Sequence, residues 1–168
     1  ALGVRNLLES TIIGEESLLL AGNASLKLGI TPTPTVSTVT TGGTIAKSTA
    51  VSVICVALSY DGMRSASVVD GIRAKVERQN ADGTTDTYGG GAAQTSAAGT
   101  VTTGAGTDTN KLVATGTQVK GAFAYAWQWG ESGEETLGEI TTVSTVEITA
   151  NATGTQKASN LPTEDCSY

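Results

Sequence analysis

The spacing of apolar side chains changes near residue 22, from a helical period to the alternation that strands show. Over residues 1–22 the apolar positions recur at steps of three, four and one, as on one side of an amphipathic helix. Gly22 and Asn23 are suited to end such a helix, because both tolerate left-handed backbone. We therefore predict one helix over residues 1–22. Its apolar stripe contains Leu7, Leu8, Ile12, Leu19 and Leu20.

One amphipathic helix cannot bury its own stripe, so this helix needs the rest of the chain or another subunit. The strands that follow supply a core of their own, and we therefore expect the stripe to contact neighbouring subunits. The side chains predicted at this subunit interface are Leu8, Ile12, Leu19 and Leu20.

From residue 35 to residue 150 the apolar positions alternate in short runs that end at turn residues. This pattern predicts an antiparallel β-sandwich. We predict a linker over 23–34, because the prolines of Thr31-Pro32-Thr33-Pro34 favour extended backbone, and an irregular polar tail over 151–168. We expect residues 89–110 to form a loop or a weak edge strand. The predicted strands cover 35–41, 50–60, 72–79, 84–88, 111–117, 122–129, 134–137 and 141–149.

The strongest strand candidate is 50–60, a nearly continuous apolar run that ends at Asp61-Gly62. Two further segments show a clear alternation. In 122–129 four aromatic residues alternate with small or polar residues, which predicts a central strand with these aromatic side chains mostly buried on one face. In 72–79, followed by the turn 80–83 and the strand 84–88, alternation predicts a hairpin with one wet face. The four aromatic residues are Phe123, Tyr125, Trp127 and Trp129.

The composition argues against several functional classes. The chain has 168 residues, a formal net charge of −6 and no histidine. Absence of histidine removes the commonest general base and metal ligand, and net negative charge disfavours binding to nucleic acid phosphates. The apolar runs are far shorter than the roughly 20 residues that a membrane span requires. We therefore expect neither enzymatic activity nor a cofactor, and no direct contact with nucleic acid or membrane.

Candidate chemical sites are few. Cys55 lies in an apolar run, which predicts a buried and unpaired thiol, whereas Cys166 lies in the polar tail and is expected to be accessible. The oxygen-rich segment 80–86 favours a hairpin turn over a calcium loop, because its glycine comes too early and no glutamate closes it. The acidic residues Glu131, Glu134, Glu135 and Glu139 favour a solvated charged loop over a pair of glycosidase carboxylates.

Two stretches resemble known families. The segment from Leu7 to Asn23, with Glu15-Glu16 followed by leucines and Gly-Asn, resembles the end of the long spine helix of tailed-phage major capsid proteins. The run 120–127 resembles the Gly-Ala-x-x-Tyr-x-aromatic strand of fibronectin type III and immunoglobulin-like domains. The runs 42–46, 51–57 and 61–62 are similar to the late strands of such modules in phage structural proteins, and their early position implies a permuted strand order or an unusual insertion.

The resemblance implies a mostly β chain, an immunoglobulin-like antiparallel β-sandwich preceded by one amphipathic α-helix. Its expected function is that of a structural virion protein, a segment of a phage head (capsid) subunit whose sandwich projects from the capsid surface. Its partners would be neighbouring capsid subunits and a host-surface ligand. The alternative is a non-enzymatic surface module that binds carbohydrate or host protein through exposed Tyr88, Trp127 or Trp129. A hydrolase is the third and weakest hypothesis.

Overall fold

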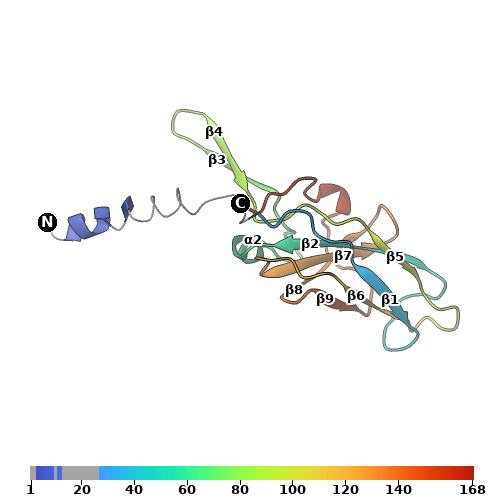
Figure 1. The fold of residues 1–168 in the computed structure, drawn as a ribbon. Helices are drawn as coiled ribbons and strands as arrows, with labels where there is room; N and C mark the ends of the chain where they lie inside the picture. The colour runs from blue at the N-terminus through green and yellow to red at the C-terminus, as the bar shows by residue number, and fades with distance from the viewer. Residues whose placement is uncertain (1–2, 10, 13–26) are drawn as a thin grey trace.

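The computed structural model describes residues 3–9, 11–12 and 27–168, and Figure 1 shows their arrangement. Residues 3–9 and 11–12 are helical, and the remainder is mostly β. A short helix α2, Tyr60–Ser65, and a 3₁₀ turn η2, Ala158–Asn160, accompany the strands. The strands are β1 Thr35–Val39, β2 Ala50–Leu58, β3 Lys75–Gln79, β4 Thr85–Gly89, β5 Gly99–Thr102, β6 Lys111–Thr115, β7 Ala124–Gly130, β8 Thr136–Thr141 and β9 Thr145–Ile148.

The strands form an antiparallel β-sandwich, as the alternation predicted. One sheet has the order β5-β2-β7-β8, and the facing sheet has the order β1-β6-β9. The inward side chains of the two sheets form one continuous core, with alternate residues of each strand pointing into it. Its fully buried or nearly buried members include Val53, Cys55, Leu112, Ala114, Tyr125, Trp127, Val146 and Ile148.

The aromatic strand β7 is central, because it pairs with β2 on one side and β8 on the other. Tyr125, Trp127 and Trp129 are buried in the inner core, which confirms three of the four aromatic assignments. Phe123 is 56% exposed, so its predicted burial is wrong. The strand begins only at Ala124, and the Phe123 ring instead packs edge-on against Tyr60 at the surface, with 5.4 Å between ring centroids.

The outer face of the four-stranded sheet is covered by a layer of irregular chain. Its small and aliphatic side chains, including Val56, Leu58 and Ala126, pack against Ile72 and Leu161. The C-terminal residues contribute to this layer, because Cys166 N–H donates to the Ala92 carbonyl at 2.9 Å. Residues 151–168 are therefore irregular, as predicted, but they pack on the sandwich.

The described part of the predicted linker, residues 27–34, is also packed. Leu28 is buried in the inner core, and the Thr31 hydroxyl accepts a hydrogen bond at 3.0 Å from the backbone N–H of Ala57. Prolines keep this segment extended, but its side chains and its backbone join it to the sandwich. The folded unit accordingly starts before residue 35 and continues beyond residue 150.

The topology supports the immunoglobulin-like assignment. The order β5-β2-β7-β8 corresponds to strands C′-C-F-G, and the order β1-β6-β9 corresponds to B-E-D. The last strand, β9, follows the G-position strand instead of preceding E, so the order is permuted. Tyr125 stands near the start of the F-position strand, and its hydroxyl accepts a hydrogen bond at 2.9 Å from the N–H of Val119. This bond is the tyrosine corner of such sandwiches.

The cysteines differ from expectation in one respect. Cys55 is buried and free, as predicted, whereas Cys166 is also buried, at 5% exposure, so its predicted accessibility is wrong. The packing of the tail against Ala92 explains the burial. Desolvation is the main cause that raises the pKa of both thiols, and the carboxylate of Glu164 adds to the shift at Cys166.

Substitution of Trp127 tests the central position of β7. Trp127→Ala should lower the free energy of unfolding by about 3–5 kcal/mol, because it removes a fully buried indole and leaves a cavity. Phe123→Ala, a truncation at an exposed position of the same segment, is the matched control and should cost under about 1 kcal/mol. Urea unfolding followed by far-ultraviolet circular dichroism measures both. Equal losses in the two variants would contradict the assignment.

Thiol labelling tests the packing of the tail. In the native protein both cysteines should react slowly with an alkylating reagent at neutral pH, because each thiol is buried and its raised pKa keeps it protonated. In denaturant both should react fast, which serves as the control and is read by mass spectrometry. Native labelling of Cys166 at the denatured rate would show that residues 151–168 detach from the sheet.

Candidate functional site

The described part of the N-terminal helix presents an exposed apolar face. Val4, Leu8 and Ile12 follow one another at steps of four residues, which aligns their side chains along one side of a helix. Leu7 flanks this row. Their exposed fractions are 72% for Val4, 69% for Leu7, 62% for Leu8 and 47% for Ile12.

Polar residues border this apolar face: by the helical period Arg5 and Glu9 lie beside Ile12, and Asn6 lies on the opposite side. The Arg5 guanidinium donates to a Glu9 carboxylate oxygen at 3.0 Å, an ion pair between residues four apart that supports a helix modestly. Helical residues 3–9 and 11–12 are therefore amphipathic, as predicted. Leu8 and Ile12 lie on this face, as their spacing predicted, and Val4 extends it by one turn.

Leu19 and Leu20 lie outside the described residues, as do Gly14, Glu15 and Glu16. The structure thus brings Leu8 and Ile12 together on one exposed face, and their predicted contacts with other subunits stay a prediction.

The residues of the alternative hypothesis are separated. Trp127 and Trp129 are buried in the core, where Trp129 Nε1 donates to the Ala150 carbonyl at 2.9 Å. Tyr88 is 51% exposed and lies on the separate hairpin sheet β3-β4. An exposed platform that combines these three residues therefore does not form.

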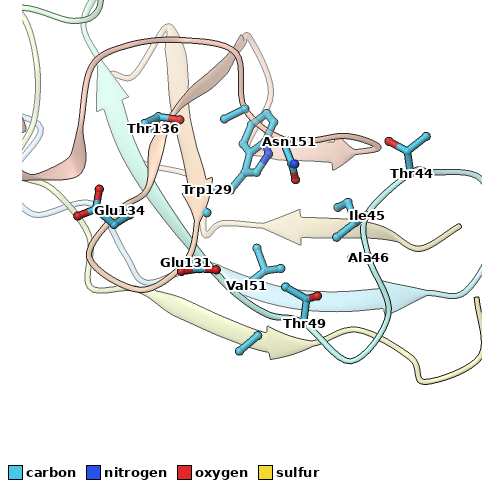
Figure 2. Close-up of a pocket in the computed structure, with 13 residues that line it drawn as sticks. Thr44, Ile45, Ala46, Thr49, Val51, Trp129, Glu131, Glu134, Thr136 and Asn151 are labelled. Carbon is cyan, nitrogen blue, oxygen red and sulfur yellow. The ribbon is translucent and has the colours of Figure 1, made fainter. Parts of the chain in front are cut away.

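A pocket of about 500 Å³ opens at one end of the sandwich (Figure 2). Its wall comes from the connection between β1 and β2, the ends of β2 and β7, the turn before β8, and the segment after β9. Threonine hydroxyls and two carboxylates give it a polar lining around Trp129. The residues are Thr44, Ile45, Ala46, Thr49, Ala50, Val51, Trp129, Gly130, Glu131, Glu134, Thr136, Asn151 and Ala152.

The acidic turn beside this pocket is stabilised by its own contacts. Glu134 forms an ion pair with Lys157 at 2.5 Å, which ties the turn to the C-terminal segment. Glu135 is only 2% exposed and accepts a hydrogen bond at 3.1 Å from the N–H of Gly133, so its predicted solvation is wrong. Gly133 has φ of +88°, the left-handed conformation that this turn requires. Glu134 and Glu135 therefore stabilise this turn through their own contacts.

The segment 80–86 forms the predicted hairpin turn. Gly83 N–H donates to the Asn80 carbonyl at 3.1 Å, and Asp82 accepts hydrogen bonds from the N–H and hydroxyl of Thr84 at 2.9 and 2.6 Å. The hydroxyl of Thr84 is the main cause that lowers the pKa of Asp82. Among the described residues, no group of three or more histidine, cysteine, aspartate or glutamate side chains is placed to hold a metal ion. In that part of the chain, no helix is long and apolar enough to cross a membrane.

Comparison with known proteins returned no relative. No family model matches this chain, and no curated protein and no solved structure matches it. Its function is therefore inferred from its own residues and their geometry.

Proposed function

We propose that this chain is a structural virion protein, a segment of a phage head subunit that carries a surface-projecting immunoglobulin-like domain. The observation that carries the proposal is the exposed apolar face of the N-terminal helix, formed by Val4, Leu7, Leu8 and Ile12. In this role the helix packs against the body of the coat protein or against neighbouring subunits.

Energetics favour a partner for this face. Burial of one leucine or isoleucine side chain stabilises a protein by roughly 1.5–3 kcal/mol, so covering Leu7, Leu8 and Ile12 releases several kcal/mol. The sandwich does not supply the cover, because its inner core is filled by its own two sheets and its outer sheet face by Ile72 and Leu161. A contiguous apolar face of this kind marks an association site.

The remaining features fit a projecting domain. The sandwich carries its own closed core and the tyrosine corner at Tyr125, so it does not depend on the helix for its interior. The net charge of −6 suits an outward surface that avoids the packaged nucleic acid. Residues 7–23 resemble a capsid spine helix, and this resemblance is the reason for proposing a coat protein in particular.

A change of the helix face tests the proposal. Leu8→Glu combined with Ile12→Glu should prevent incorporation of the subunit into particles, because it places charge where apolar contact is needed. The amount of the chain in purified particles, measured by mass spectrometry, reports incorporation. The melting temperature of the isolated variant should equal that of the wild type, since both side chains are exposed.

Asn6→Glu is the matched control, because Asn6 is exposed in the same helix but lies about half a turn away from Leu8. It adds the same charge and should leave incorporation unchanged. Absence of the wild-type chain from purified virions would contradict the proposal. A lower melting temperature of the double variant would instead place the helix against the sandwich.

A second candidate, the surface binding module, is favoured by one observation. Tyr88 and Tyr168, both at least half exposed, line a pocket of about 290 Å³ together with Lys75 and Glu164. Aromatic faces beside polar groups are suited to bind a sugar ring. If this candidate holds, the chain binds glycans on an array and Tyr88→Ala lowers the signal at least about tenfold, whereas Tyr60→Ala, at another exposed tyrosine, does not.

A further inference from the structure

A long connecting segment joins two strands that are neighbours in one sheet. Strands β2 and β5 pair antiparallel, a relation that a two-residue turn can connect. Here residues 59–98 connect them, and they include α2 and the hairpin β3-β4. The hairpin forms its own two-stranded sheet and extends away from the sandwich (Figure 1). It is therefore an addition that the sandwich does not need.

The hairpin buries almost nothing. Every residue of β3 and β4 is exposed except half-buried Gly89, so the predicted dry face is absent from the hairpin itself. Of the predicted dry face, only Ile72 and Ala74, which precede β3, are buried or half-buried. At its base Lys75 forms an ion pair with Glu164 at 2.6 Å, which connects it to the C-terminal segment. An isolated two-stranded hairpin is marginally stable in water. The hairpin therefore adds little to the stability of the fold, and stability does not explain why the chain contains it.

The turn nevertheless holds the two strands in one register. Asn80 N–H donates to the Thr84 carbonyl at 2.8 Å, and Gly83 has φ of +84°. Asp82 accepts two hydrogen bonds from Thr84, as described above. Because this turn chemistry defines the register, the hairpin presents a defined pattern of side chains on each face.

One face of the hairpin carries an apolar pair and two opposite charges. Val76 lies opposite Tyr88, and Arg78 lies opposite Asp86, so all four side chains share one face. The apolar pair is toward the base and the charged residues toward the tip. Among residues 27–168, Arg78 makes no ion pair, whereas Asp86 Oδ2 accepts hydrogen bonds from Asn80 Nδ2 at 2.9 Å and from the Tyr88 hydroxyl at 3.4 Å.

This face is complementary to itself. A two-fold axis that runs along the hairpin, between two facing copies, exchanges the positions of β3 and β4. It places Arg78 opposite the partner's Asp86 and Val76 opposite the partner's Tyr88, in both directions at once. Matching of this kind is what an isologous contact between identical chains requires.

We propose that the β3-β4 hairpin is a docking arm that pairs face to face with the same hairpin of a second copy of this chain. The mixed charges argue for such a partner: Lys75 and Arg78 are accompanied by Glu77, Asp82 and Asp86, whereas a nucleic acid would select a positive excess. The proposal rests on the proposed function in one respect, since the second copy would be a neighbouring subunit of the shell.

Charge reversal with mixing tests the pairing. All chains carry Leu8→Glu and Ile12→Glu, so that association through the helix is removed. Arg78→Asp alone and Asp86→Arg alone should each weaken self-association in sedimentation velocity by at least about tenfold, because like charges then face each other twice. An equimolar mixture of the two variants should associate about as tightly as the parent, because both contacts between the unlike chains then join opposite charges again.

The mixture separates a contact between chains from one within a chain. Each variant places like charges at positions 78 and 86 of its own hairpin, and mixing cannot restore opposite charges inside one hairpin. Glu77→Arg, which makes the same charge change as Asp86→Arg but on the opposite face, is the matched control and should leave association unchanged. Circular dichroism of each variant confirms that the sandwich is folded.

Three results would overturn the docking arm: a parent chain that stays monomeric, a mixture that stays as weak as its components, or a control that weakens association as much as Asp86→Arg. Each leaves the proposed function standing, because the helix variants are tested separately by incorporation into particles. Conversely, restored association in the mixture together with normal incorporation of the helix double variant would uphold the docking arm and overturn the proposed role of the helix.

Discussion

The burial of β7 on both faces is the constraint on which the rest of the structure depends. On its inner face Trp127 is fully buried and donates from Nε1 to the hydroxyl of Thr141 at 2.8 Å. On its outer face the side chains of Ala124 and Ala126 are small, so irregular segments of the same chain pack closely against the strand. A strand buried on both faces needs cover on both sides. The three-stranded sheet supplies one cover, and irregular segments with Ile72 and Leu161 supply the other.

Two appendages outside this sandwich carry exposed apolar groups, although the sandwich and its loops expose others, such as Ile30, Val69 and Val143. The N-terminal helix exposes Leu8 and Ile12, and the β3-β4 hairpin exposes Val76 and Tyr88. Neither core contains a described side chain of the helix or of the β3-β4 hairpin, so both appendages are available for contacts with other chains. Both proposals place the contacts with other chains on these two appendages.

Local patterns predicted much of the fold. Alternation located β7, because residues of one face recur every second position whatever the partner strand is. A nearly continuous apolar run located β2, because a strand buried on both faces needs apolar residues at every position. The hairpin turn at 80–83 was predictable because Asn80, Asp82 and Gly83 carry turn chemistry in their own side chains and backbone. For the helix face, the period alone identified Leu8 and Ile12, whereas the contacts of that face depend on surfaces that no single-chain pattern contains.

The sequence by itself therefore determined the class of fold, the helix-then-sandwich order and the central aromatic strand, since each follows from short-range period and composition. Only the tertiary structure decided which apolar residues are covered. Phe123 has the right period but lies outside the strand, and Cys166 lies in a polar segment but is covered through its backbone pairing with Ala92. The permuted place of β9 was likewise decided by long-range pairing with β6, for which neighbouring residues carry no signal. Burial depends on contacts between residues far apart in the chain, and local patterns do not record them.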